Sequence, residues 1–355
     1  MRPVRAGEEL DIAKVDAWLK PRVHGLEGAP EVTQYSGGAS NWTYRLRYAS
    51  HDLVLRRAPA GTKAKSAHDM GREFRIQRAL KPSFPLVPDM VAFCDDASVL
   101  DSEFYVMQRL DGLILRKNLP KDLALTPERT RTLCLNMVDT LIRLHGVEVA
   151  CTDLESLGRG PGYARRQIDG WSDRYRKART WNVPRLEDVM RWLAARVGED
   201  VATCVIHNDF RFDNIVLDAK DATRLVGVLD WEMATLGDPL MDLGNALAYW
   251  VQADDDFFLR ALRRQPTHLP GMLTRREVVD YYCEKTGRTA ENWTFYEVSG
   301  LFRLAVIAQQ IYFRYQRGES KNRAFRHFWL FVTYLGFRCR RLIRAASGKQ
   351  PATNV

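Results

Sequence analysis

The chain has 355 residues, of which 46% are hydrophobic and 27% are charged. This composition is typical of a folded globular protein and excludes collagen-like, low-complexity and disordered classes, while the length predicts two packed lobes rather than one ordinary domain. The 53 lysines and arginines outnumber the 44 acidic residues, and the net charge of +9 favours anionic partners such as nucleotides, coenzyme A esters or nucleic acid.

The sequence predicts neither a secretory leader nor a membrane span. No apolar core follows the basic N-terminus, and the longest uncharged apolar stretch near the C-terminus, residues 327–337, is shorter than the roughly 20 residues that a span needs. Six cysteines are scattered without a CxxC pair, which favours reduced thiols over a disulfide scaffold or a zinc site. We therefore expect a cytoplasmic protein without a membrane partner.

Residues 31–57 alternate apolar and polar side chains, which predicts three antiparallel strands near 32–35, 42–48 and 53–55. A glycine-rich turn joins the first two strands. Because glycine permits positive φ and a close backbone approach, the N–H groups of this turn could contact phosphates, although such turns more often serve only to reverse the chain. The turn residues considered for this contact are Gly37, Gly38, Ser40 and Asn41.

A helix is predicted next, over Ser66–Leu80, with Ser66 as its N-cap and three prolines after its end. Short strands at 90–93 and 104–108 complete this β-rich part of the chain, and Asp111-Gly112 is a turn signal typical of a hinge. We expect an N-terminal lobe over residues 1–108, a hinge at about 108–112 and a C-terminal lobe over 113–355.

Beyond the hinge the pattern becomes helical. Thr126 as N-cap, Pro127 at the first helical position and Gly146 after the last turn predict one clearly bounded helix. Two short β segments, 215–217 and 225–229, flank a polar turn, and helical patterns dominate from there to the C-terminus. The sequence thus predicts an α+β chain with a small β-rich lobe, which carries one main helix, and a larger helical lobe.

Three oxygen-bearing side chains are expected to converge after the first of these β segments is approached. An apolar strand leads into His207 and Asp209, Asn214 closes the polar loop, and a hairpin returns the chain to Asp230. Phosphoryl transfer needs a carboxylate that orients the attacking hydroxyl and hard oxygen ligands that hold Mg²⁺ against the triphosphate. Each residue alone is ordinary, and His207 by itself is more often structural, but their combination favours this chemistry.

The pattern His-x-Asp-x-x-x-x-Asn with a later Leu-Asp-Trp-Glu resembles the aminoglycoside phosphotransferase and choline kinase-like family of small-molecule kinases over most of the chain. The resemblance implies a bilobal protein kinase-like fold, with ATP and Mg²⁺ bound by a nucleotide-binding N-lobe and a catalytic C-lobe. It implies that Asp209 is the catalytic base, that Asn214 and Asp230 bind Mg²⁺, and that His207 and Asp242 support the loop structurally.

Two positions depart from the family pattern. Asn208 stands where many members have glycine. Arg56 stands where the family usually has the strand lysine that contacts the α/β-phosphates, and Glu73 on the following helix is its implied ion-pair partner. A guanidinium is larger than an ammonium but binds phosphate in bidentate fashion, so Arg56 or its neighbour Arg57 is the candidate contact; a surface arginine pair is the ordinary alternative.

The segment at Gln108 and Leu110 resembles the hinge whose backbone receives the adenine, with Met107 facing the pocket interior. A buried edge of the small-lobe sheet is the more ordinary interpretation of residues 104–107, and both can hold. Backbone contacts do not identify the purine, so the choice between ATP and GTP stays open.

The acceptor is a hydroxyl group of a small molecule. Segments 53–59, 163–171 and 229–239 resemble the branch related to the kinase domain of the acyl-CoA dehydrogenase 10 and 11 type, which implies a 4-hydroxyacyl-CoA thioester as acceptor. A polycationic aminoglycoside needs an acidic cleft, whereas coenzyme A phosphates need basic side chains such as those in 165–179 and 314–326, although charge runs are more often solvated faces. The candidate acceptor contacts are Arg166, Trp171 and Arg314.

Three alternatives stay open: an aminoglycoside or other small-alcohol kinase, a nucleotide-binding pseudokinase or scaffold, and a nucleic-acid binder. The intact Asp209, Asn214 and Asp230 argue against a pseudokinase. A nucleic-acid binder would use the arginine-rich helix expected over 325–345, but its apolar side chains are expected to pack on the large lobe, so no nucleic-acid partner is predicted. Those side chains are Phe328, Leu330, Phe331, Tyr334, Leu335 and Leu342. The natural acceptor and the oligomeric state are not readable from the sequence.

Overall fold

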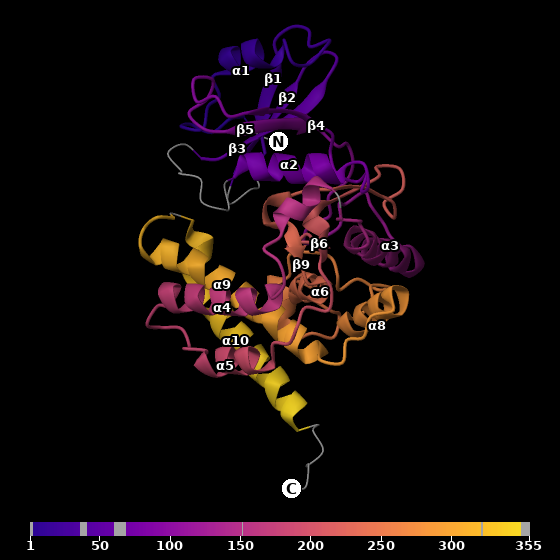
Figure 1. Cartoon of the computed structure of the whole chain (residues 1–355), viewed down its shortest axis with the longest axis vertical. Coiled ribbons are helices and arrows are strands. Elements are labelled where there is room, and N and C mark those ends of the chain that lie inside the picture. The colour runs from indigo at the N-terminus through magenta and orange to yellow at the C-terminus, as the bar shows by residue number, and fades with distance from the viewer. Residues whose placement is uncertain (1–2, 36–40, 60–68, 151, 321, 349–355) are drawn as a thin grey trace. The chain divides into compact units, whose positions relative to one another are not determined.

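The computed structural model describes residues 3–35, 41–59, 69–150, 152–320 and 322–348, and it divides into two compact units (Figure 1). The lobe boundary expected at 108–112 stays a prediction, since the first unit also takes in two later segments of the chain. The first unit comprises Met1–Leu115, Val147–Leu157 and Phe212–Ala234, and the second comprises Arg116–Gly146, Gly158–Arg211 and Thr235–Val355.

The first unit is built on a five-stranded antiparallel sheet with the strand order β1-β2-β3-β5-β4. The strands predicted between residues 31 and 57 and the two that follow the first long helix are confirmed. Their bounds are β1 (Glu31–Gln34), β2 (Trp42–Arg47), β3 (Asp52–Arg57), β4 (Met90–Cys94) and β5 (Phe104–Gln108).

Both faces of this sheet are buried, because a helix covers each one (Figure 1). Successive side chains of a strand point to opposite faces. In β3, Leu53 and Leu55 therefore join the apolar cluster that contains α1 (Ile12–Leu19), while Val54 joins the cluster of α2 (Met70–Leu80). This double burial explains why the strands read as nearly continuous apolar runs.

Helix α2 begins later than predicted. Its N-cap is Asp69, whose carboxylate accepts a hydrogen bond of 2.7 Å from the backbone N–H of Arg72, and the first helical residue is Met70. The predicted cap, Ser66, lies outside the described residues. Aspartate caps a helix as well as serine does, so the cap preference alone did not separate the two positions.

A second hairpin, β7 (Ile215–Leu217) with β8 (Leu225–Val228), completes the first unit and confirms the two predicted β segments. The backbone N–H of Val228 donates to the carbonyl of Leu86 at 2.8 Å. Trp231 follows in the short helix η3 (Trp231–Met233), fully buried with its ring edge-on to Phe84. The hairpin thereby holds the segment after β8 on the same unit as the sheet.

The second unit is helical, apart from the two-stranded pairing of β6 (Cys204–Ile206) with β9 (Thr235–Gly237). The predicted helix after the hinge is confirmed as α3, with the Thr126 hydroxyl capping it and Gly146 ending it. The remaining helices are α4 (Tyr163–Ala178), α5 (Glu187–Arg196), α6 (Pro239–Ala248), α7 (Phe257–Leu262), α8 (Arg275–Thr286), α9 (Trp293–Gln316) and α10 (Phe328–Ser347), with α3 spanning Pro127–His145.

Helix α9 is the centre of this unit, and α4, α6 and α10 pack against it (Figure 1). The crossing of α6 and α9 depends on glycine at both helices. A Cβ atom on Gly300 would lie 2.2 Å from the carbonyl oxygen of Gly244, so neither position accepts a side chain without moving a helix. No helix within the described ranges is both long and apolar enough to cross a membrane.

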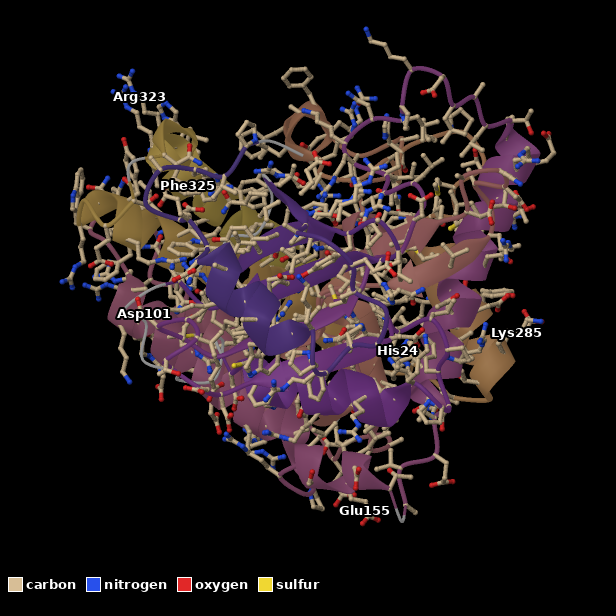
Figure 2. The ribbon with its side chains drawn as sticks, turned by 90° about the horizontal axis from the view of Figure 1, so that it is seen from above. His24, Asp101, Glu155, Lys285, Arg323 and Phe325 are labelled. Carbon is tan, nitrogen blue, oxygen red and sulfur yellow. The ribbon has the colours of Figure 1, made fainter. Side chains whose placement is uncertain are left out.

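Helix α10 begins at Phe328, after the short helix η4 (Arg323–His327), rather than at residue 325. Its buried stripe is Val332, Leu335, Gly336 and Cys339, which share one face at helical spacing. Leu330 lies off this stripe and is 41% exposed, so the prediction that it packs on the helical lobe is wrong. In Figure 2, Arg323 of η4 and Lys285 of α8 extend outward from the periphery of the molecule, and both are exposed.

Candidate active site

The loop after β6 is held by its backbone as well as by its side chains. Asn208 has φ of +65°, a left-handed conformation that asparagine tolerates better than most residues and that glycine adopts freely. This explains how asparagine can stand where many family members have glycine. Its side-chain oxygen accepts hydrogen bonds of 3.0 Å from the Tyr163 hydroxyl and from the Asn245 amide.

Asp242 of α6 binds the same loop from below. Its two carboxylate oxygens accept the backbone N–H groups of His207 at 2.8 Å and Asn208 at 2.7 Å, and His145 Nε2 lies 3.1 Å away. Burial by itself raises the pKa of Asp242, but the hydrogen bonds and charges of His145 and His207 outweigh burial and bring the pKa below its ordinary value. The fully buried carboxylate therefore stays ionised and fastens two consecutive peptide groups.

Asp209 follows these two anchored residues. Its backbone N–H donates to His207 Nδ1 at 3.2 Å, and its carboxylate forms an ion pair of 3.0 Å with Arg211 Nε. The Arg211 guanidinium in turn stacks 4.9 Å from the ring of Tyr249. Sequence reasoning missed Arg211, although a cation two residues from the candidate base was visible in the loop.

Asn214 and Asp230, the candidate magnesium ligands, both belong to the first unit. The Asn214 carbonyl accepts from the backbone N–H of Leu229 at 2.8 Å, so the residue before Asp230 is bonded to Asn214. Asp230 has φ of +68°, which is a strained backbone for aspartate and is common at functional sites. Asp209 belongs to the second unit.

Arg56 is the centre of a charged cluster in the first unit. Its guanidinium lies 3.2 Å from Glu73, 3.2 Å from Asp230 and 3.7 Å from Glu232. Burial favours loss of its charge, but Glu73 and the other anions raise the pKa of Arg56 well above its ordinary value. The ion pair between Arg56 and Glu73 is thus present, and one cation faces three carboxylates.

Neighbouring side chains extend this cluster. The Tyr105 hydroxyl donates to Glu73 at 2.8 Å, and the Asn41 amide donates to Glu232 at 3.2 Å. Burial raises the pKa of Glu73, and Arg56 offsets that rise only in part. The other turn residues considered for phosphate contact, Gly37, Gly38 and Ser40, lie outside the described residues.

Arg57 faces the opposite side of the sheet from Arg56. It is buried, and its guanidinium lies 4.8 Å from the centre of the Trp42 ring. At the expected hinge, the Gln108 backbone N–H donates to the Asp89 carbonyl at 2.8 Å, and Leu110 packs closely on Gly227. Met107 is buried in the apolar cluster beneath α2.

The donor chemistry around Asp230 fits a magnesium ion. Carboxylate and amide oxygens, here from Asp230 and Asn214, are the hard ligands that Mg²⁺ takes in phosphoryl-transfer sites, usually together with substrate phosphates. Among the described residues, no group of three or more histidine, cysteine, aspartate or glutamate side chains is arranged to hold a metal ion alone. A nucleotide is therefore needed to complete the coordination.

The candidate acceptor residues are not gathered in one place. Arg166 donates to the backbone carbonyls of Gly160 and Pro161, the second contact being very short. Arg314 is exposed in the last turn of α9. Trp171 is buried, with the guanidinium groups of Arg174 and Arg303 at 4.5 and 5.4 Å from its ring centre.

Sequence reasoning also missed Arg303. It lies in the middle of α9 with only 5% of its surface exposed. One signal was available: between Glu297 and Arg314 it is the single residue with a full charge, in an otherwise apolar and amide-bearing run.

The architecture described above, an N-terminal antiparallel sheet with a large helical portion, is a kinase-like fold, as predicted. The chain belongs to the phosphotransferase enzyme family, APH, whose pattern matches residues 31–278. This family assigns it to the small-molecule kinases. The recognition made from the His-x-Asp-x-x-x-x-Asn and Leu-Asp-Trp-Glu motifs is thereby confirmed.

Two curated relatives carry names from another enzyme class. The chain is 35% identical over 325 residues to acyl-CoA dehydrogenase family member 10 of Mus musculus, covering 90% of this chain and 30% of that protein. It is 33% identical over 324 residues to acyl-CoA dehydrogenase family member 11 of Homo sapiens, covering 88% of this chain and 40% of that protein. The chain thus spans less than half the length of these relatives.

Solved structures show the same fold. A candidate aminoglycoside phosphotransferase from Ralstonia eutropha is 27% identical with a TM-score of 0.80, over 95% of this chain and 99% of that one. A choline kinase from Cryptosporidium parvum has a TM-score of 0.64 at 10% identity, covering 95% and 97%. An aminoglycoside phosphotransferase in ternary complex with AMP-PNP and hygromycin B has a TM-score of 0.56 at 16% identity, covering 90% and 95%.

Proposed function

We propose that this small-molecule kinase transfers the γ-phosphoryl group of ATP, in the presence of Mg²⁺, to a hydroxyl group of a 4-hydroxyacyl-CoA thioester. The observation that supports phosphoryl transfer best is the loop after β6, in which Asp242 fixes two consecutive peptide groups directly before Asp209. A candidate base needs such fixed geometry, because phosphoryl transfer depends mainly on positioning and electrostatics.

In the proposed reaction, Asp209 orients the acceptor hydroxyl and takes its proton. The hydroxyl oxygen forms a bond to the γ-phosphorus, while the bond between that phosphorus and the bridging oxygen of the β-phosphate breaks and ADP leaves. The ion pair with Arg211 holds the Asp209 carboxylate in one orientation, and the His207 ring accepts the Asp209 N–H.

Asn214 and Asp230 would hold the magnesium ion. When bound, Mg²⁺ supplies charge neutralisation for the phosphate oxygens. Arg56, held by Glu73, would contact the α/β-phosphates in place of the usual lysine, since its planar guanidinium can bind two oxygens at once. Release of Arg56 from Asp230 and Glu232 accompanies this contact, because the same guanidinium nitrogen faces both carboxylates in the ligand-free chain.

Two observations support a coenzyme A thioester as acceptor. The curated relatives are named acyl-CoA dehydrogenases, so a kinase segment of such a protein would act on the same class of compound. The net charge of +9 suits the coenzyme A phosphates and opposes a polycationic aminoglycoside. The solved relatives support the second candidate, an aminoglycoside or other alcohol kinase.

The test compares ATP consumption with a 4-hydroxyacyl-CoA, the matching free hydroxy acid and an aminoglycoside as acceptors. We expect the thioester to be phosphorylated fastest. Arg166→Ala should raise the acceptor KM more than the ATP KM if Arg166 contacts the coenzyme A phosphates, and salt should weaken that contact because the Debye length is roughly 8 Å at physiological ionic strength. Faster turnover of the aminoglycoside would overturn the thioester proposal and leave a kinase of another alcohol.

The role of Asp209 has its own test. Asp209→Asn keeps the shape of the side chain but removes the proton acceptor, so phosphoryl transfer should fall by about 10²-fold or more. Nucleotide affinity and the unfolding temperature should stay unchanged, which separates catalysis from folding. Turnover within a few-fold of the unsubstituted chain would exclude Asp209 as the base, and turnover absent from both chains would favour a pseudokinase.

A further inference from the structure

Arg303 is a buried cation that lacks an anionic partner. It is 95% buried in the interior of α9, as its exposure of 5% shows. Within the part of the chain that the structure describes, no carboxylate, carbonyl or hydroxyl group is bonded to its guanidinium, and its one recorded close contact is the ring of Trp171. Arg275 and Arg338, by contrast, both reach the carboxylate of Asp255.

The contact with Trp171 does not compensate the charge of Arg303. A cation–π contact recovers only part of the cost of removing a guanidinium from water, and buried charges are normally paired with an opposite charge. The same ring also carries the Arg174 guanidinium at 4.5 Å, so the two positive groups share one aromatic partner. The local charge is therefore positive and unbalanced.

This positive centre acts on a residue that holds the catalytic loop. The Tyr163 hydroxyl donates to Asn208 at 3.0 Å, and Asn208 directly precedes Asp209. Burial raises the pKa of Tyr163, and the nearby charge of Arg303 opposes that rise. Tyr163 and Trp171 lie on one helix, α4, so both ends of this arrangement belong to the second unit.

We propose that Arg303, flanked by Trp171 and Arg174, recognises an oxyanion of the acceptor, either a carboxylate or a phosphate. This inference rests on the proposed kinase function and adds a requirement to it: the preferred acceptor carries negative charge besides its hydroxyl group. The planar guanidinium matches two oxygens of such a group, and burial strengthens the pairing. Polycationic alcohols are poor ligands for this site.

Stability separates this role from a structural one. Replacing an unpaired buried cation with an apolar side chain of similar length removes a desolvation cost, so ligand-free Arg303→Met should unfold at the same temperature as the unsubstituted chain or at a higher one. Arg196→Met is the matched control, because Arg196 stacks on Trp192 at 4.6 Å but is only partly buried. A fall of several degrees for Arg303→Met alone would show that Arg303 is structural and would overturn the proposal.

The kinetic test uses the full chain with three acceptors that share a primary hydroxyl: 4-hydroxybutyryl-CoA, 4-hydroxybutyrate and 1,4-butanediol. We expect the neutral diol to be the poorest, and Arg303→Met to raise the KM of an anionic acceptor about tenfold or more while the ATP KM stays constant. Arg303→Lys should restore part of the affinity. An effect confined to the thioester identifies a phosphate, and an effect shared with the free acid identifies a carboxylate. Equal use of the diol, or an unchanged acceptor KM, overturns the proposal.

Thermal protection by 4-hydroxybutyryl-CoA and by inorganic phosphate, without nucleotide, distinguishes the two levels of inference. If no acceptor is phosphorylated but protection occurs and is lost in Arg303→Met, the acceptor proposal fails and the anion site stands. If phosphorylation occurs without any protection that depends on Arg303, the kinase stands and the anion site is refuted. Absence of both phosphorylation and protection refutes both.

Discussion

Asn208 and Asp230 share a backbone conformation that is uncommon outside glycine, with φ of +65° and +68°. Both positions adjoin the residues proposed for catalysis and metal binding. Left-handed backbone at a bulky residue costs free energy and persists only where neighbouring contacts hold it. At Asn208 those contacts are visible in the hydrogen bonds from Tyr163 and Asn245.

Two substitutions at Asn208 separate backbone strain from side-chain bonding. Asn208→Gly and Asn208→Ala both lose the hydrogen bonds from Tyr163 and Asn245, but alanine additionally carries a Cβ into the left-handed region. We expect Asn208→Ala to be less stable than Asn208→Gly by about 1 kcal/mol. Urea unfolding measures the difference, and equal stability of the two variants would show that the backbone of this loop is not held at positive φ.

Asp230→Ala tests the metal site. Loss of this carboxylate should weaken the affinity for Mg²⁺ with ATP and the metal dependence of the rate, because a hard oxygen ligand is missing. Calorimetric titration of the nucleotide, with and without Mg²⁺, measures the change. Asp95→Ala, which removes an exposed carboxylate from the same unit, is the control. Unchanged magnesium-dependent affinity in Asp230→Ala would refute a ligand role.

At the scale of elements, the helical unit depends on how closely α9 approaches its neighbours. Glycine is a poor helix former, yet Gly244 and Gly300 stand where α6 and α9 cross. The Cβ clearance explains both glycines through packing rather than local preference. Gly170 of α4 differs, since a Cβ there would meet only the flexible end of Arg174 at 3.5 Å.

The same substitution in these two helices should therefore have opposite effects. Gly300→Ala should destabilise the chain by about 1–3 kcal/mol, because the new methyl group overlaps the α6 backbone. Gly170→Ala should stabilise it by up to about 1 kcal/mol through the higher helix propensity of alanine. Denaturant unfolding of both variants gives the comparison. A neutral Gly300→Ala would mean that the two helices separate without cost.

For the whole molecule, buried carboxylates link stability to pH. Asp255 pairs with Arg275 of α8 and Arg338 of α10, so it joins two helices of the second unit. Burial tends to raise the pKa of Asp255, but Arg275 and Arg338 outweigh burial and the pKa lies below its ordinary value. The folded state then binds fewer protons than the unfolded state, and the stabilisation is present above the ordinary aspartate pKa of about 3.9.

We expect this contribution to be lost as pH falls from about 4 toward the lower folded-state pKa. Asp255→Asn should therefore be less stable than the unsubstituted chain at pH 7, and the difference should shrink in acid. Asp254→Asn, at an exposed neighbouring carboxylate, is the control. Urea unfolding between pH 3 and pH 7, chosen to bracket about 3.9, measures the slopes. A difference that stays constant with pH would contradict the ion-pair role.

The sequence by itself determined the features that depend on short stretches of chain. Alternation predicted the sheet strands, Thr126 and Gly146 bounded α3, and the spacing of Asp209, Asn214 and Asp230 identified the kinase family. These features follow from local periodicity, capping and motif spacing, which neighbouring residues define without knowledge of distant ones.

The tertiary structure decided which polar groups lose water and which charges meet. Nothing in the residues around Arg56 shows that it faces Asp230 and Glu232, which are far along the chain. Likewise, only packing buries Arg303 against Trp171 and leaves Leu330 exposed on α10. Burial sets the energetic weight of a charge, and burial depends on contacts between distant segments, so the predicted acceptor residues Arg166 and Arg314 stood out in the sequence while Arg303 did not.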